Sequence, residues 1–192
     1  HKTLRGPRGG IILSRGVVSN PLKAPENTRE NIPTILDRSV FPGLQGGPHM
    51  NQIAATAVCL KEAATPEFHA YAKQVLINAK ALAKALMANG AKLVTDGTDN
   101  HMMVIDCVKS WQMPGNEVEK ILDKAGITTN KSLIPDDPNP PFKPSGVRLG
   151  TPAMTTRGMK ETEMEYIASL MRKALSNNTN EDILNQIKNE VK

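Results

Sequence analysis

A long helical pattern between Thr65 and Gly90 is the feature that most constrains the fold of this chain. Apolar residues recur there at intervals of three and four positions, which is the period of a helix that buries one face. Thr65 followed by Pro66 is typical of a helix start, and glycine is typical of a helix end. We therefore expect the segment 65–90 to be one helix that connects two domains. Its predicted apolar stripe consists of Phe68, Ala72, Val75, Ala79, Leu82 and Leu86.

The sequence after this helix predicts a small α+β domain over residues 91–192. Short apolar runs bounded by turn residues, which are typical of strands, alternate there with helical spacing. Strands are predicted at residues 92–95, 101–107, 127–130 and 147–150. Helices are predicted around residues 118–125, 164–174 and 181–191.

The sequence before the helix predicts part of a larger α/β domain over residues 1–64, together with the start of the connecting helix. The apolar run 10–14 is bounded by glycine and predicts a buried strand. Residues 20–47 are rich in proline, glycine and asparagine and predict an irregular, functional loop. A helix is predicted after Pro48 from the helical spacing of Met50, Ile53, Ala54, Ala57 and Val58.

The chain carries a net charge of +5, and most of this excess lies in residues 1–38. That region holds seven basic and three acidic side chains, a balance that favours phosphate and carboxylate ligands. Aromatic residues make up only 3% of the chain, so the stacking surface typical of nucleic-acid binding is not expected. No apolar run approaches the ~20 residues of a membrane span. The composition therefore indicates small anionic ligands.

The two cysteines, Cys59 and Cys107, lie far apart in apolar surroundings and lack the spacing of a metal site. We therefore expect two buried, reduced thiols, as is typical of a cytoplasmic protein. The four histidines show no metal-binding spacing either, so no metal centre is expected.

The segment 1–10, His-Lys-Thr-Leu-Arg-Gly-Pro-Arg-Gly-Gly, places a lysine near two arginines and several glycines. Enzymes that use pyridoxal phosphate (PLP) require one lysine whose amine forms an imine with the cofactor aldehyde. From the residues alone, Lys2 could be this lysine or part of a solvated basic segment. The segment resembles the cofactor-lysine motif of serine hydroxymethyltransferases. This resemblance implies that Lys2 binds PLP, that His1 helps to set its surroundings, and that Arg8 contributes to the cofactor and substrate region from a neighbouring subunit.

The segment 41–48, Phe-Pro-Gly-Leu-Gln-Gly-Gly-Pro, ends where a helix is predicted to begin. Adjacent glycines leave backbone N–H groups uncovered, and a helix N-terminus favours negative charge, so an anion site is physically reasonable. For the Gly-Gly pair taken alone, a plain tight turn is the simpler interpretation. The segment resembles the stretch of the same family whose glycines reach the PLP phosphate of a neighbouring subunit. This implies that Gly46 and Gly47 bind phosphate across a dimer interface.

The segment 145–153, Ser-Gly-Val-Arg-Leu-Gly-Thr-Pro-Ala, places an arginine in a predicted strand among small residues. Such an arginine can bind a carboxylate through two parallel hydrogen bonds, or it can be an exposed structural residue. The segment resembles the family motif whose arginine holds the carboxylate of the amino-acid substrate, which implies that role for Arg148. Residues 127–131 resemble the family region near the folate cosubstrate, and Ser132 stands where the family carries asparagine. Because serine offers a hydroxyl in place of an amide, the use of folate is left open.

In this order, the motifs resemble the carboxy-terminal half of serine hydroxymethyltransferase. The resemblance implies a partial aspartate-aminotransferase-like fold of PLP enzymes (fold type I), with α/β and α+β parts: the end of the large domain, the connecting helix and the small domain. It implies PLP as cofactor and tetrahydrofolate as cosubstrate, in the reversible conversion of serine and tetrahydrofolate to glycine and 5,10-methylenetetrahydrofolate. It also implies a homodimer, or a dimer of dimers, with active sites at the subunit interface.

Two alternatives stay open on the sequence. The family carries roughly its first half upstream of the cofactor lysine, so this chain alone could be a truncated, non-catalytic homologue that acts as an interaction partner. The serine at position 132 also leaves open a PLP-dependent threonine aldolase that does not use folate.

Overall fold

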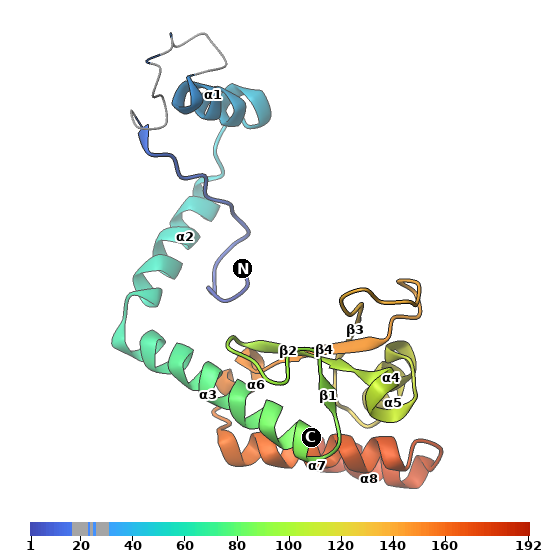
Figure 1. Cartoon of the computed structure of the whole chain (residues 1–192). Helices are drawn as coiled ribbons and strands as arrows, with labels where there is room; N and C mark the ends of the chain where they lie inside the picture. Colours follow the sequence, from blue (N-terminus) through green and yellow to red (C-terminus); the bar gives the residue numbers. More distant parts are fainter. Residues whose placement is uncertain (17–22, 24, 26–30) are drawn as a thin grey trace. The chain divides into compact units, whose positions relative to one another are not determined.

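The structure, a computed structural model, describes residues 1–16, 23, 25 and 31–192 (Figure 1). It consists of two compact units, His1–Thr65 and Pro66–Lys192, which are built in different ways. Secondary structure is mixed, with helices in both units and one small antiparallel sheet in the second. Within the described ranges, no helix combines the length and the apolar character needed to cross a lipid bilayer.

The regular structure described in the first unit is helical. It comprises α1 (Ile32–Arg38), the π-helical turn η2 (Ser39–Leu44) and α2 (Met50–Ala63). The helix predicted after Pro48 is confirmed as α2, but most of its apolar side chains are exposed, and Cys59 is the buried residue of this helix. Gly6 packs against this cysteine: a Cβ atom at Gly6 would lie 2.8 Å from Cys59 Sγ, so a larger residue there would collide with it.

The irregular loop predicted over residues 20–47 is wrong for residues 32–44, which form α1 and η2. The Asn31 side chain caps α1 by accepting a hydrogen bond from the Thr34 N–H at 3.3 Å. Pro33 lies in the first turn, where a helix does not need its missing N–H. Proline therefore starts a helix here rather than excluding one. Residues 17–22, 24 and 26–30 of the predicted loop lie outside the described residues.

The buried strand predicted at residues 10–14 is also wrong. This segment has no regular secondary structure, and its side chains are exposed, with Ile11 at 80% and Leu13 at 88%. A strand persists only where a neighbouring strand satisfies its backbone groups. The described residues of the first unit include no strand that could pair with it.

The second unit is built around a four-stranded sheet of β1 (Lys92–Leu93), β2 (Met102–Asp106), β3 (Asn130–Ser132) and β4 (Gly146–Gly150). The strand order is β1-β2-β4-β3, and every neighbouring pair is antiparallel. The strands β1, β2 and β4 confirm three of the predicted strands.

The fourth predicted strand, at residues 127–130, is displaced, because β3 begins only at Asn130. The Ile127 N–H donates to the Leu122 carbonyl at 2.8 Å, and the Gly126 N–H donates to the Asp123 carbonyl at 2.9 Å. These two bonds, with Gly126 at φ +79°, form the Schellman motif that ends a helix. The start of the predicted strand therefore closes the preceding helix and does not join the sheet.

The helices of the second unit are α3 (Pro66–Ala88), α4 (Cys107–Trp111), α5 (Gly115–Lys124), α6 (Pro152–Thr156), α7 (Glu161–Ser176) and α8 (Glu181–Val191). Four of them confirm the predicted helices. The other two, α4 and α6, were not predicted, because five residues are too few to show a helical period.

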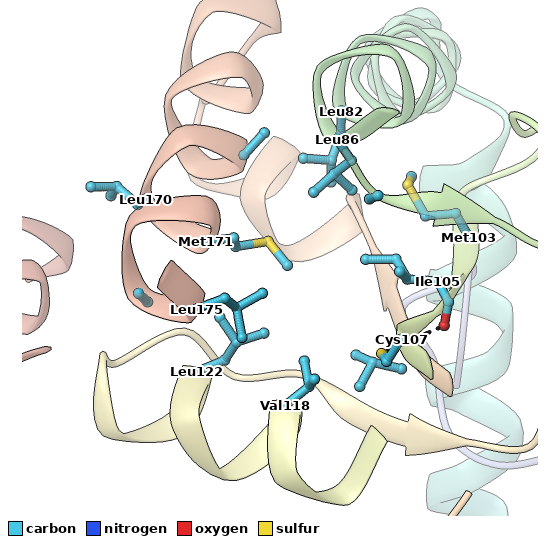
Figure 2. Packing of buried hydrophobic residues seen from close by; sticks show 14 of the residues in the cluster. Leu82, Leu86, Met103, Ile105, Cys107, Val118, Leu122, Leu170, Met171 and Leu175 are labelled. Carbon is cyan, nitrogen blue, oxygen red and sulfur yellow. Dashed lines mark hydrogen bonds between the residues drawn. The ribbon is translucent and has the colours of Figure 1, made fainter. Parts of the chain in front are cut away.

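The hydrophobic core of the second unit lies between the sheet and its helices (Figure 2). α3 and α5 contact the strands, and α7 packs against both of these helices. Ile105 of β2 and Val147 of β4 are fully buried on this side of the sheet. The labelled core side chains of Figure 2 come from α3, β2, α4, α5 and α7; they are Leu82, Leu86, Met103, Ile105, Cys107, Val118, Leu122, Leu170, Met171 and Leu175.

Two glycines allow close packing in this unit. Gly115, the first residue of α5, lies so close to β4 that a Cβ atom there would overlap the Gly146 carbonyl oxygen. A Cβ atom at Gly146 would lie 2.8 Å from the Ile134 side chain and 2.9 Å from the Ile105 carbonyl oxygen, so this glycine makes room for β2 and for the loop after β3. The Gly115 N–H also donates to the Pro144 carbonyl at 2.7 Å, so the start of α5 is bonded to the chain that enters β4.

Candidate active site

Lys2, His1 and Arg8 lie in an amino-terminal segment without regular secondary structure. All three side chains are exposed. Within the described ranges, no hydrogen bond or ion pair engages the Lys2 amine. This amine is therefore accessible to an aldehyde carbon, which is the chemistry that a PLP lysine requires.

Gly46 and Gly47 lie in the connection between η2 and α2. A Cβ atom at either glycine would meet nothing within 4 Å, so the space beside their backbone is open. The Gln45 N–H donates to the Val40 carbonyl, but the two glycine N–H groups donate to no acceptor among the residues that the structure describes. α2 begins just beyond them, at Met50. Open space, uncommitted N–H groups and a helix start together suit a phosphate.

Arg148 lies in the middle of β4, on the face of the sheet that the core helices do not cover. Side chains along a strand alternate between the two faces, and its neighbour Val147 is fully buried in the core. Arg148 therefore points away from the core, and its side chain is exposed. Within the described chain, its guanidinium has no ion pair or hydrogen bond. It is available for a carboxylate ligand.

The register of the sheet places the substrate-side residues next to each other. Asn130 of β3 lies directly opposite Arg148, and Ser132 lies opposite Gly146. Ser132 is therefore on the same face as Arg148, at the diagonal position, where Cα atoms are about 7–8 Å apart. Its hydroxyl donates to the Leu133 carbonyl at 3.2 Å. The structure thus brings Arg148 and Ser132 together on the open face and adds Asn130 to them.

The proline-rich loop between β3 and β4 is closed by the Asp137 carboxylate. This carboxylate accepts hydrogen bonds from the Ser145 N–H at 2.8 Å and from the Ser145 hydroxyl at 2.7 Å. It also accepts from the Asn139 N–H at 2.9 Å and from the Ile134 N–H at 3.3 Å. The loop is therefore fastened at the residue that leads into β4.

The same hydrogen bonds shift the titration of Asp137. Desolvation would raise the pKa of this carboxyl, but the bonds from Ser145, Asn139 and Ile134 outweigh it and lower the pKa from 3.8 to about 2. Asp137 is therefore ionised at neutral pH. The ionised Asp137 carboxylate therefore holds Ser145, the residue just before the strand that carries Arg148.

The sequence analysis missed two polar residues of the second unit, Asn78 and Asp137, although each has a signal in the sequence. Asn78 interrupts the apolar stripe of α3 between Val75 and Leu82, and a polar residue at a core position requires buried partners. Asp137 precedes Asn139 by two positions in a proline-rich run, which is the spacing of an Asx turn.

The candidate residues fall into two groups, one in each unit. The first unit holds His1, Lys2, Arg8 and the glycine pair, and the second holds Arg148 and Ser132. Within the first unit, no described contact joins Lys2 to either glycine.

Comparisons with known proteins cover both groups. The sequence model described as serine hydroxymethyltransferase matches residues 1–171, a range that includes every candidate residue. A serine hydroxymethyltransferase of Myxococcus xanthus (strain DK1622) is 48% identical over 192 residues. Those of Koribacter versatilis (strain Ellin345) and Acidobacterium capsulatum are 48% and 49% identical over 191 residues.

These matches cover 100% of this chain but only 42%, 41% and 41% of the three relatives. The chain thus spans about two fifths of the length of the curated relatives that it matches. The range matched by the family model nevertheless includes both the lysine segment and the arginine strand. The chain belongs to the serine hydroxymethyltransferase family.

Proposed function

We propose that this chain supplies part of the active site of a PLP-dependent enzyme that interconverts serine and glycine and exchanges one carbon with tetrahydrofolate. The family match over residues 1–171 carries the proposal, because that range contains the lysine, the glycine pair and the substrate arginine. The chain matches 41–42% of each relative, so the activity is proposed for the protein as its cell makes it, not for these residues alone.

The described residues fit PLP in two respects. Gly46 and Gly47 offer uncommitted N–H groups beside open space, which suits the cofactor phosphate. Lys2 offers an exposed amine without a partner in the described chain, which suits the cofactor aldehyde. When bound, PLP supplies an electron-withdrawing ring that stabilises negative charge on the α-carbon of the amino acid.

In this proposal, Lys2 would hold the cofactor through its side-chain amine, the group that the PLP aldehyde requires. His1, the neighbour of this lysine in the sequence, would help to set the surroundings of its amine. Arg8 adds positive charge beside the bound phosphate and carboxylate. The excess of basic residues in 1–38 supports this arrangement, because it favours both anions over bulk solvent.

Arg148 binds the carboxylate of serine or glycine through two parallel hydrogen bonds and so fixes the orientation of the α-carbon. Its position on the open face of the sheet supports this role. Ser132 lies on the same face and offers its hydroxyl toward the folate cosubstrate. The site is thus proposed to bind both substrates on one face of the sheet.

Replacing Lys2 tests the cofactor assignment. In the full-length protein, Lys2→Ala is expected to abolish serine turnover, because no other amine is proposed to hold PLP. Lys61→Ala is the matched control, since Lys61 is an exposed lysine of α2 without a proposed role, and it is expected to keep normal turnover. Near-normal turnover in the Lys2→Ala enzyme would exclude the assignment, and so would equal losses in the two variants.

Replacing Arg148 tests the substrate assignment. Arg148→Ala is expected to weaken glycine binding on the order of 100-fold, the effect of losing two charge-assisted hydrogen bonds, while PLP stays bound. Arg148→Lys keeps the charge but loses the planar fork, so an intermediate effect is expected. Glycine titrations followed by PLP absorbance measure both binding steps. Loss of PLP, with unchanged glycine affinity, would contradict the role.

Folate dependence separates this function from that of a threonine aldolase. We expect the exchange of the serine hydroxymethyl carbon to require tetrahydrofolate. Ser132→Asn restores the family residue and is expected to strengthen folate binding while leaving glycine affinity unchanged. Folate-independent cleavage of threonine, with no folate-dependent serine turnover, would instead identify the aldolase.

We also propose a cytoplasmic homodimer or dimer of dimers in which Gly46 and Gly47 of one protomer reach the PLP of its partner. The exposed apolar residues of α2 support an assembly, because Met50, Ile53 and Val58 are each more than half exposed. A mixture of inactive Lys2→Ala and Gly47→Val proteins tests it. Hybrid dimers regain activity if sites are shared, because one of their two sites then carries neither substitution. No recovery in verified hybrid dimers would exclude shared sites.

A further inference from the structure

A buried polar network joins α3 to the end of the strand that carries Arg148. The Asn78 amide donates from Nδ2 to Thr155 Oγ1 and to the Met159 carbonyl, both at 2.9 Å. The Thr155 hydroxyl donates to the Thr151 carbonyl at 2.9 Å. The Thr151 hydroxyl donates to the Val75 carbonyl of α3 at 2.8 Å. Three side chains thus connect two helices and the turn that follows β4.

All three side chains of this network are buried, and their hydrogen-bonding capacity is used. Asn78 and Thr151 are 0% exposed, and Thr155 is 8% exposed. The remaining acceptor of Asn78, its Oδ1 atom, receives a hydrogen bond from Gln74 Nε2 at 2.9 Å. An unpaired polar group is costly in such surroundings. The network therefore favours one position of α3 relative to α6 and the turn after β4, whereas apolar contacts alone would allow several.

The network acts close to Arg148 along the chain. Thr151 follows the arginine by three residues, and its N–H donates to the His101 carbonyl at 3.1 Å. The end of β4 is therefore bonded on one side to the chain that enters β2 and on the other side to α3. At the start of β4, the Asp137 carboxylate fastens Ser145. Polar anchors hold the arginine strand at both ends.

We propose that Thr151 and Thr155, supported by Asn78, are positioning residues for substrate binding. They fix the end of β4 relative to α3, so that Arg148 presents two parallel N–H donors of its guanidinium to the substrate carboxylate at once. This inference rests on the proposed carboxylate-binding role of Arg148. Without the Thr151 hydroxyl, the end of β4 shifts relative to α3, and the guanidinium meets the carboxylate with one donor.

The test uses the full-length protein, with glycine titration, serine kinetics and thermal unfolding measured on each variant. Thr151→Val keeps the side-chain shape and removes the bond to the Val75 carbonyl. It is expected to raise the glycine Kd and the serine KM about fivefold, the loss of one hydrogen bond, with kcat changed by less than about twofold. Thr155→Val is expected to act in the same direction, and it replaces the first variant if that protein does not fold.

Two further variants separate positioning from a general loss of stability. Thr151→Ser keeps the hydroxyl and is expected to restore the glycine Kd to within about twofold of the unsubstituted protein, as a retained hydrogen bond predicts. Ser110→Ala removes a hydroxyl that bonds to Asp106 and Lys92 elsewhere in the same unit. It is expected to lower the unfolding temperature without changing the glycine Kd.

Arg148→Ala distinguishes a failure of this inference from a failure of the proposed function. If Arg148→Ala weakens glycine binding and both Thr→Val variants bind glycine normally, the positioning role is wrong while the arginine assignment stands. If Arg148→Ala itself leaves glycine binding unchanged, the proposed function fails, and the positioning role fails with it. An equal rise of Kd in Ser110→Ala would also overturn the positioning role.

Discussion

The two units of this chain differ in how they use their apolar residues. The second unit gathers them into a continuous core around the sheet, in which residues such as Ile105, Leu122 and Leu86 are almost completely buried (Figure 2). The first unit leaves most of its described apolar residues exposed, including Leu13 at 88% and Leu44 at 89%. Burial of apolar surface is the main source of folding free energy. The second unit therefore holds most of the stability of this chain.

The candidate chemistry is divided differently. The groups proposed to bind the cofactor, Lys2 and the pair Gly46 and Gly47, lie in the first unit, whose described residues contribute nothing to the hydrophobic core. The groups proposed to bind the substrate, Arg148 and Ser132, lie on a sheet that a core supports. The core of the second unit can thus fix the positions of the substrate groups, whereas the described part of the first unit offers the cofactor groups no such support.

Separating the units should have the largest effect. Residues 66–192 expressed alone are expected to unfold cooperatively in urea, because their core is complete within the unit. Residues 1–65 are expected to show no cooperative transition. Circular dichroism at increasing urea concentration measures both fragments. A sharp transition in the 1–65 fragment would contradict the difference between the units.

Matched substitutions to alanine should show the same difference at single positions. Leu86→Ala, at a residue that is 1% exposed, is expected to reduce the free energy of unfolding of the 66–192 fragment by about 2–5 kcal/mol. In the full chain, Leu13→Ala, at a residue of the first unit that is 88% exposed, is expected to change it by no more than about 0.5 kcal/mol. Chemical denaturation measures both. A large effect at Leu13 would show that this segment is buried in solution.

The cysteines should differ in reactivity between the units. Desolvation and the neighbouring Asp106 carboxylate raise the pKa of the Cys107 thiol to about 12, so almost none of it is thiolate at neutral pH. Cys107 is expected to react with a thiol reagent only on unfolding of the second unit. Cys59 is covered in part by Gly6, and most of the described apolar residues around it in the first unit are exposed, so faster labelling is expected there. Mass spectrometry of each labelled peptide at pH 7 gives the two rates, and a faster rate at Cys107 would contradict this expectation.

The smallest effect is expected in the loop of the second unit that Asp137 closes. The pKa of Asp137 is lowered to about 2, so its carboxylate stabilises the folded state fully above pH 4 and loses this effect as the pH falls through about 2. Asp137→Asn is therefore expected to lower the unfolding temperature at pH 6 and to have little effect near pH 2. Asp123→Asn, at an exposed carboxylate of α5, is the control. A constant difference across this pH range would show that Asp137 does not act through its charge.

Much of the second unit could be predicted from its sequence, because the signals that define it are local. The limits of α3 follow from Pro66 and Gly90, and the predicted range of the last helix agrees with α8 (Glu181–Val191). Helical periods and helix ends depend on residues a few positions apart, so the sequence alone displays them.

The errors arose where distant partners decide the structure. Residues 10–14 have the composition of a strand but no strand to pair with among the described residues, and Ile127 bonds to a helix end instead of a sheet. The network of Asn78 and Thr151 joins positions more than seventy residues apart, which no spacing rule connects. For the site, the motifs indicated Arg148 and Ser132 separately, but only the strand register showed that they share a face.

The contact between Gly115 and Gly146 limits how this protein can change over time. A methyl group at either position would overlap backbone or side-chain atoms of a neighbouring element. Replacing either glycine, even by alanine, therefore requires the neighbouring atoms to move. The strand beside this contact carries Arg148, and the helix on its other side contributes Val118 and Leu122 to the core. A protein that keeps the arginine strand packed against this helix therefore has to keep glycine at both positions. This constraint comes from packing, since neither glycine takes part in the proposed reaction.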